Sequence, residues 1–170
     1  MVFSGGIIPW YIVVRSLGLR NTIWSMIIPV LVNPWNVFLV RSFFGSIPPS
    51  IHESAKLDGA GEFMILFRIV YPLSMPILAT VSLFYGVAYW NDWFNALMFV
   101  DKRELYPLQL LLREILTTAQ AVSAKGISMQ GKMFPTEGVK MATAVVSMGP
   151  ILLLYPYVQK YFIKGITIGA

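Results

Sequence analysis

PPSIHESAKLDGAGEFMILFRIVYPLSMP, residues 48–76, is a polar and well-punctuated stretch between two long apolar segments. Pro48 and Pro49 stop whatever precedes them, because a proline ring cannot continue a helix and restricts the residue before it. Ser50 and Glu53 have the spacing of a capping box, in which the hydroxyl and the carboxylate satisfy free backbone amides at a helix start. A short helix is therefore expected to begin at Ser50.

The same stretch contains a second helix signal after a turn. Gly59 can adopt a positive φ at little cost and is expected to end the first helix. A second helix is expected from Glu62 to about Val70, ended by Pro72, because apolar residues recur at helical spacing. These residues are Phe63, Leu66, Phe67 and Val70. The stretch thus predicts two short helices joined at Gly59 and lying outside a bilayer.

The composition of the whole chain indicates an integral membrane protein. Hydrophobic residues make up 56% of the chain and charged residues 12%, against about 25% charged in soluble domains. Mean hydropathy is +0.67. The chain has no cysteine, which excludes disulfides and Cys-based zinc sites. The net charge of +5 is spread along the sequence without a basic run, which argues against nucleic acid as a partner.

Three apolar segments are long enough to cross a bilayer, which takes about 20 helical residues. They cover residues 22–44, 72–100 and 139–163, and prolines interrupt the first and the third. Pro150 and Pro156 are expected to break the third. Residues 1–14 are apolar but too short to span, so they are interpreted as the end of a helix whose start is missing. The expected fold is an all-α bundle of three complete spans and a partial one, the C-terminal portion of a larger, N-terminally truncated domain over residues 1–170.

One long polar connection, residues 101–138, separates the second and third segments. Leucine spacing within it predicts an amphipathic helix over residues 107–119. Residues 123–135 contain Gly and Ser and are expected to form a loop. The distribution of basic residues between the two faces does not decide the orientation of the spans.

Residues 53–72 resemble the EAA signature of binding-protein-dependent ABC importer permeases. Glu53-Ser54-Ala55 is followed at the signature spacing by Gly59, Ile69 and Pro72. Two positions depart from the pattern: Ser54 replaces an alanine and Tyr71 replaces a leucine.

Three further segments resemble the carbohydrate branch of the same family. Residues 17–22 look like the outer turn before the fourth helix, residues 90–94 like the end of the fifth helix, and residues 161–170 like the C-terminal tail. The chain is similar to maltose-permease-like importers of oligosaccharides and polysaccharide fragments. The resemblance implies a type I ABC importer fold in the bacterial inner membrane, multi-pass. Residues 45–71 would be a cytoplasmic coupling loop and residues 101–138 an extracytoplasmic loop.

The resemblance also implies a function and a set of partners. The chain would form part of the translocation path and couple ATP hydrolysis by a partner ATPase to uptake of an oligosaccharide. A second, homologous permease and an extracytoplasmic solute-binding protein would complete the transporter. The sequence contains no P-loop. With a single histidine and no cysteine it also lacks the residues of a nucleophilic catalytic triad, so no enzyme activity and no cofactor are expected. A non-translocating membrane anchor and an ion-coupled secondary carrier remain alternatives.

The resemblance places the ATPase contact on the coupling loop, at Glu53, Ser54, Ala55, Asp58, Gly59, Ala60 and Phe67. Several of these residues also have purely structural interpretations. Glu53 can serve only as a helix cap, and Gly59 can serve only to end a helix. Asp58 can cap the second helix or pair with a basic residue of the partner. Phe67 is interpreted mainly as core packing against the membrane helices, and His52 as a surface residue.

A second group of residues has the chemistry of a carbohydrate site. It comprises Trp90, Asn91, Asp92, Trp93 and Asn95. Aromatic faces stack on sugar rings, and amides and carboxylates bind hydroxyls. The alternative is an interfacial aromatic belt that anchors a span at headgroup depth.

Overall fold

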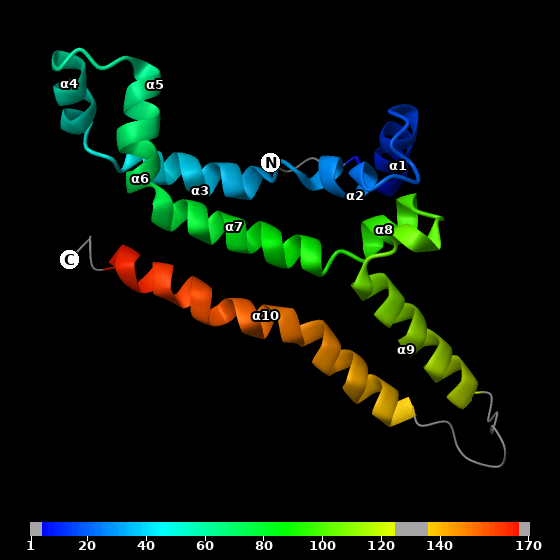
Figure 1. The fold of residues 1–170 in the computed structure, drawn as a ribbon. Coiled ribbons are helices and arrows are strands. Elements are labelled where there is room, and N and C mark those ends of the chain that lie inside the picture. Colours follow the sequence, from blue (N-terminus) through cyan, green and yellow to red (C-terminus); the bar gives the residue numbers. More distant parts are fainter. Residues whose placement is uncertain (1–4, 125–135, 167–170) are drawn as a thin grey trace. The chain divides into compact units, whose positions relative to one another are not determined.

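The computed structural model describes residues 5–124 and 136–166, with residues 153–166 described by their backbone alone. Within these ranges every regular element is a helix and no strand occurs (Figure 1). The expected loop at 123–135 lies almost wholly outside the described residues, as do positions 167–170 of the predicted C-terminal tail and residues 1–4 of the first apolar segment. The chain divides into two compact units, Met1–Leu31 with Val87–Leu154, and Val32–Gly86 with Tyr155–Ala170.

The second of these units begins with α3 (Pro34–Gly45), whose start is fixed by a strong local signal. Asn33 caps it, because its side-chain oxygen accepts hydrogen bonds from the backbone N–H groups of Trp35 and Asn36 at 2.9 and 3.4 Å. Pro34 occupies the first helical position, where its missing N–H costs nothing. The Asn33 N–H also donates to the hydroxyl of Tyr85 at 3.0 Å, which ties the start of α3 to α7 (Met75–Trp90).

Between α3 and α7 the chain forms the two short helices expected from the sequence. The first is α4 (Pro49–Leu57). The second is one helical segment that runs through α5 (Glu62–Ile65), the π-helical turn η2 (Leu66–Val70) and α6 (Tyr71–Leu73). The name elbow is used below for residues 49–73. Figure 1 shows α4 and α5 side by side and joined by a short turn.

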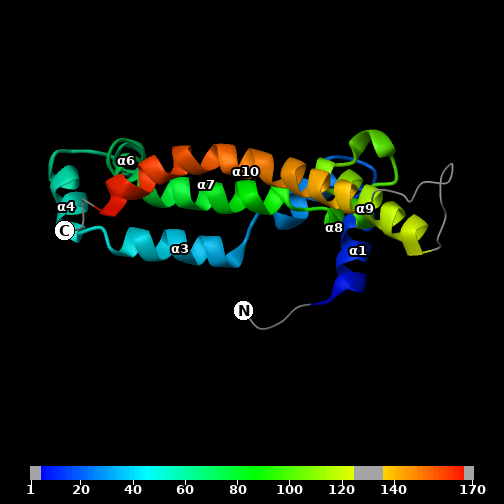
Figure 2. The same ribbon diagram turned by 90° about the horizontal axis from the view of Figure 1, so that it is seen from below.

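The expectation that Pro72 ends the second helix is wrong. Helical backbone continues through Pro72 to Leu73, and the chain bends by 74° at Ser74 before α7 begins. A proline has no N–H to donate and crowds the carbonyl four residues earlier. The wider π turn just before Pro72 relieves that crowding, and π turns and prolines are the usual causes of a sharp bend. Figure 2 shows the bend as α6 seen nearly end-on while α7 runs across the view.

The other unit is built around α8 (Phe94–Phe99), which packs on three neighbours: α1 (Ile7–Ser16), α2 (Trp24–Ile27) and α9 (Leu108–Ala124). Phe99 is fully buried and stacks on Tyr11 of α1, with ring centroids 5.9 Å apart. Ala96 and Leu110 complete the centre of this core. The amphipathic helix predicted for 107–119 is confirmed as α9, and it extends five residues further than expected. The 3-10 turns η1 (Ile28–Val30) and η3 (Arg103–Leu105) complete the set of short elements.

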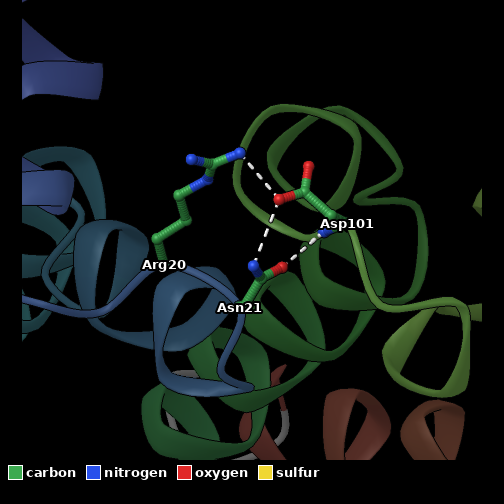
Figure 3. Close-up of polar contacts among 3 residues, drawn as sticks. All are labelled: Arg20, Asn21 and Asp101. Atoms are coloured by element: carbon green, nitrogen blue, oxygen red, sulfur yellow. Dashed lines mark hydrogen bonds and ion pairs between the residues drawn. The ribbon is translucent and has the colours of Figure 1, made fainter.

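The outer turn, residues 17–22, is fastened to Asp101, which lies two residues after the end of α8 (Figure 3). Asn21 adopts a positive φ of 59°, which Asn tolerates better than most residues. Its side-chain amide donates to Asp101 Oδ2 at 3.1 Å, and its side-chain oxygen accepts the Asp101 N–H at 2.6 Å. Arg20 adds an ion pair to the same carboxylate at 2.7 Å. The turn therefore has one specific arrangement, fixed mainly by Asn21.

Within the described residues, no single helix is both long enough and apolar enough to cross a bilayer. Two bent pairs satisfy that test together, Trp24–Val30 with Pro34–Gly45 and Glu62–Leu73 with Met75–Trp90. The expected segment 72–100 is divided, since α7 ends at Trp90 and α8 is separate. In contrast, α10 (Thr136–Ile166) runs through Pro150 and Pro156, so the break expected in segment 139–163 is absent. Each proline removes one helical hydrogen bond, and the bonds on either side keep the helix continuous.

Candidate functional site

The turn at the tip of the elbow is a complete Schellman motif. The N–H of Ala60 donates to the carbonyl of Ala55, and the N–H of Gly59 donates to the carbonyl of Lys56, both at 3.0 Å. Gly59 has a φ of 78°, and a Cβ placed on it would meet nothing within 4 Å. The predicted turn at Gly59 is confirmed. Backbone conformation, rather than space inside this chain, is what favours glycine there.

One carboxylate forms exposed ion pairs that link the two helices of the elbow. Glu62 at the start of α5 accepts from Lys56 Nζ at 2.7 Å and lies 3.4 Å from His52 Nε2, both on α4. The hydrogen bond from Lys56 holds the pKa of Glu62 below its ordinary value of 4.5, although desolvation opposes the shift. We refer to His52, Lys56 and Glu62 as the clasp. His52, interpreted as a surface residue, has a side chain that is 43% exposed within the clasp.

The capping box expected at Ser50 and Glu53 is not formed. The helix begins at Pro49, and Pro48 occupies the cap position. The fixed φ of Pro49 starts the helix one residue early, and Pro48 has no N–H to which Glu53 could return a bond. Ser50 instead accepts, through its carbonyl, a hydrogen bond from the Ser54 hydroxyl at 2.8 Å. Glu53 is exposed and bonds no described residue, so its interpretation as a cap is wrong.

Asp58 does not cap the second helix of the elbow either. It is the C-terminal cap residue of α4, and the cap position of α5 is taken by Gly61, without a side-chain hydrogen bond. Asp58 is exposed, with its carboxylate available at the tip of the elbow. Its interpretation as a partner contact stays a prediction.

The elbow buries few apolar side chains and exposes several. Ala55 and Ile65 are buried, Ile65 being only 1% exposed. Leu57 is 89% exposed, Phe63 80% and Phe67 64%, which contradicts the interpretation of Phe67 as core. Exposed apolar side chains in one segment can form a contact surface. The elbow offers Leu57, Phe63 and Phe67 for such a contact.

Most side chains of the predicted carbohydrate group form hydrogen bonds with other residues of this chain. The Trp90 indole N–H donates to the carbonyl of Ser147 on α10 at 2.9 Å. The Asp92 carboxylate accepts both the backbone N–H and the side-chain amide of Asn95, at 3.1 and 2.8 Å. Asn91 donates to the carbonyl of Val87 at 3.0 Å. These contacts shape the junction between α7 and α8.

Trp93 differs from its neighbours because it lines a pocket of about 340 Å³. The Arg113 guanidinium carbon lies 3.5 Å from the centroid of the Trp93 ring, a cation–π contact. Gln109 and Gln120 of α9 and Lys140 of α10 also line the pocket. The structure thus brings an aromatic face, two amides and two cations together. We refer to this site as the Trp93 pocket.

Sequence reasoning missed the clasp and most of the Trp93 pocket. The clasp had a local signal, because Lys56 and Glu62 have opposite charges and lie on either side of a glycine turn. Arg113, Gln109 and Lys140 had none, because they lie in segments that only the fold brings to Trp93.

A family model, binding-protein-dependent transport system inner membrane component, matches residues 2–168. Two similar proteins come from Bacillus subtilis strain 168. Protein LplC is 44% identical over 170 residues, and the polygalacturonan/rhamnogalacturonan transport system permease protein YtcP is 43% identical over 171 residues. Both alignments cover 100% of this chain, which spans 58% of the first relative and 60% of the second.

The fold is also similar to a solved structure. A chain in the crystal structure of a bacterial ABC transporter involved in the import of the acidic polysaccharide alginate matches with a TM-score of 0.78 and 33% identity. The match covers 94% of this chain and 57% of that chain. The helical fold, the family match along almost the whole sequence and these relatives agree. The chain belongs to the family of binding-protein-dependent transport system inner membrane components.

Proposed function

We propose that this chain forms part of the permease of an ATP-binding-cassette importer that takes up an oligosaccharide. The family membership supports a transport role in the inner membrane. The relatives support carbohydrate as the cargo, since their names refer to polygalacturonan, rhamnogalacturonan and alginate. ATP hydrolysis belongs to partner ATPase subunits, which act on this chain through the elbow. A second permease and an extracytoplasmic solute-binding protein complete the proposed transporter.

The geometry of the elbow is the observation that carries this proposal. A short helix with exposed apolar anchors is suited to helix-in-groove recognition, in which a few side chains supply most of the contact. Leu57 and Phe63 provide such anchors on either side of the Gly59 turn. Glu53 and Asp58 are exposed beside them, available to basic residues of a groove. In the proposed complex the tip of the elbow enters a groove of the ATPase.

A coupling element must also be stiff, because a flexible contact would absorb movement of the ATPase without passing it on. The elbow is stiffened in two ways. The Schellman motif fixes the path of the backbone at Gly59, and the clasp joins α4 to α5 through Glu62. Its second helix then continues into α7 with only the bend at Ser74 between them. Movement of the elbow would therefore reach α7 directly.

This function requires a specific orientation in the membrane. Residues 45–71 would lie in the cytoplasm, where ATP is available, and residues 101–138 outside it. The absence of cysteine makes this testable, because each introduced thiol is the only one in the chain. Leu57→Cys places a thiol at an 89% exposed position of the elbow. Lys102→Cys places a matched, exposed thiol in the long connection.

The experiment uses the cysteine-free protein with one introduced thiol, co-expressed with its transporter partners. A membrane-impermeant maleimide should label Lys102→Cys in intact spheroplasts and Leu57→Cys only in inside-out vesicles. A short bifunctional cross-linker should then join Leu57→Cys to the ATPase subunit, and Lys102→Cys should give no such product. Labelling of Leu57→Cys from outside, or cross-links to every subunit except the ATPase, would disprove the coupling role.

A further inference from the structure

The Trp93 pocket contains an unsatisfied polar group that points to a ligand. The side-chain nitrogen of Gln109 is buried and has no hydrogen-bond partner among the described residues. Such groups are rare in native proteins, because burying an amide without a partner costs free energy. Gln109 lines the pocket. Once the side chain turns so that this nitrogen faces the cavity, the amide can donate to an oxygen atom of a bound molecule.

The second feature is the Arg113 guanidinium, which is exposed and therefore accessible to a ligand. It lies over the Trp93 ring and takes part in none of the ion pairs among the described residues. Stacking leaves the N–H groups at the edge of the guanidinium plane free to bind a carboxylate in a forked geometry. The neighbouring Glu114 lines a different pocket, together with Arg103. Arg113 is therefore positioned to receive an anion.

The remaining charges around the pocket favour an anion as well. Lys140 also lines it, and its ammonium is paired with Glu137 at 2.7 Å. Arg113 and Lys140 carry two positive charges, and Glu137 balances that of Lys140. The positive charge of Arg113 is the one that remains unbalanced. A carboxylate on the ligand could pair with that charge, whereas a neutral sugar could not.

The aromatic face and the size of the pocket indicate a ring-shaped ligand. The Trp93 ring is partly buried and packs edge-on against Phe94, with centroids 5.6 Å apart, which restricts its orientation. A volume of about 340 Å³ lies at the lower end of the range for small-molecule sites, about 300 to 1,000 Å³. That volume suits one or two sugar rings rather than a long chain.

We propose that the Trp93 pocket is a subsite for an acidic sugar residue, a uronate, whose carboxylate binds Arg113 while Gln109 binds an adjacent oxygen atom. This inference rests on the proposed function, because it names the chemical class of the cargo and the residues that select it. Along the chain, the elbow leads into the N-terminal end of α7 and the pocket follows its C-terminal end. In the proposed orientation, the subsite would meet cargo on the extracytoplasmic side.

The test measures saccharide binding to the complete transporter in nanodiscs without its solute-binding protein, so that the selectivity of that protein does not contribute. The probes are trigalacturonate and its fully methyl-esterified form, which has the same rings without the charge. Wild-type transporter should bind the acid at least tenfold more tightly than the ester. Arg113→Gln should weaken binding of the acid about tenfold or more, the usual effect of losing a charge-assisted bond, and leave the ester unchanged.

Three further variants separate the contributions. Arg113→Lys keeps the charge but loses the planar fork, so it should fall between wild type and Arg113→Gln. Gln109→Leu should weaken both probes several-fold. Arg103→Gln is the matched control, since it removes an exposed arginine outside the pocket and should bind like wild type.

Equal affinity of wild type and Arg113→Gln for trigalacturonate, or no measurable binding by either, would overturn the subsite. If Arg113→Gln instead weakened only the association with the solute-binding protein, the pocket would be a docking site for an acidic protein surface and the proposal would be wrong. ATP hydrolysis stimulated by the solute-binding protein is recorded in the same nanodiscs. If the solute-binding protein still stimulates ATP hydrolysis while the subsite predictions fail, only the subsite proposal is wrong and the proposed importer function stands. If the wild-type transporter shows no such stimulation, the result counts against the proposed importer function.

Discussion

Substitution of Gly59 separates a structural role of the turn from a role in contacting the ATPase. A Cβ at this position meets nothing within 4 Å, so alanine introduces no clash inside the chain. The cost comes from the φ of 78° and is about 1 to 2 kcal/mol for a residue with a Cβ. Asparagine costs less, because it tolerates this conformation. These costs are small beside a typical stability of 5–15 kcal/mol, so Gly59→Asn, Gly59→Ala and Gly59→Trp should all fold.

The three variants are compared in proteoliposomes that contain the full-length permease and its partners. Uptake of a labelled oligosaccharide and ATP hydrolysis are recorded together, and the amount of membrane-inserted protein is measured by immunoblot. Gly59→Asn should retain most of the uptake. Gly59→Trp should lose at least tenfold of it at equal protein amount, because the added ring would occupy the space that the ATPase groove needs. Gly61→Ala, at a nearby glycine with an ordinary φ of −73°, is the control and should behave as wild type.

Loss of uptake is expected to follow the volume of the side chain at position 59 and not the backbone strain. Gly59→Trp with uptake equal to that of Gly59→Asn would show that no groove closes around the turn. Equal and severe losses in all three variants would show instead that the left-handed conformation itself is what the transporter requires.

Two further predictions concern the clasp and the outer turn. Because the pKa of Glu62 is lowered, its ion pair contributes to stability above pH 4.5 and is lost as the pH falls through the lowered value. The distribution of distances between spin labels at Leu57→Cys and Phe63→Cys should therefore be narrow at pH 7 and broaden below pH 4.5. In Glu62→Gln the distribution should already be broad at pH 7, and a width that does not depend on pH would contradict the prediction. Asn21→Ala should lower the stability of the purified protein by about 1 to 3 kcal/mol, because the positive φ becomes unfavourable and two hydrogen bonds are lost. Arg20→Ala removes only an exposed ion pair and should cost under about 1 kcal/mol. Thermal unfolding in detergent measures both variants, and a larger loss in Arg20→Ala would contradict the conclusion that Asn21 is the main residue fixing the outer turn.

Local signals in the sequence predicted the parts of the fold that depend on local chemistry. Gly59 and the surrounding apolar spacing predicted the elbow because a positive φ and a helical period are properties of a few consecutive residues. The same logic failed at Ser50 and Pro72. At Ser50 the neighbouring Pro49 started the helix early, and at Pro72 a π turn allowed the helix to continue.

Features that depend on tertiary packing could not be predicted from local sequence patterns. Phe67 has helical spacing like a core residue, yet the fold leaves it exposed because no described segment covers it. The Trp93 pocket depends on Arg113 and Lys140, which belong to helices distant in sequence from Trp93. An aromatic and amide-rich stretch could indicate carbohydrate chemistry, but the sequence pattern alone did not identify the cation that would select an acidic sugar.

The 74° angle at Ser74 sets the direction in which a push on the elbow would act. By projection, a displacement along the axis of the elbow's second helix has only about a quarter of its length along α7, and nearly all of it across α7, as in the lateral movements of packed helices. The bent backbone is joined by hydrogen bonds on both sides, from the Ser74 N–H to the Val70 carbonyl at 2.9 Å and from the Leu78 N–H to the Ser74 carbonyl at 3.0 Å. An axial displacement of the elbow's second helix would thus become a lateral displacement of α7. Lateral displacement of a helix is the kind of motion that opens or closes a passage between neighbouring helices.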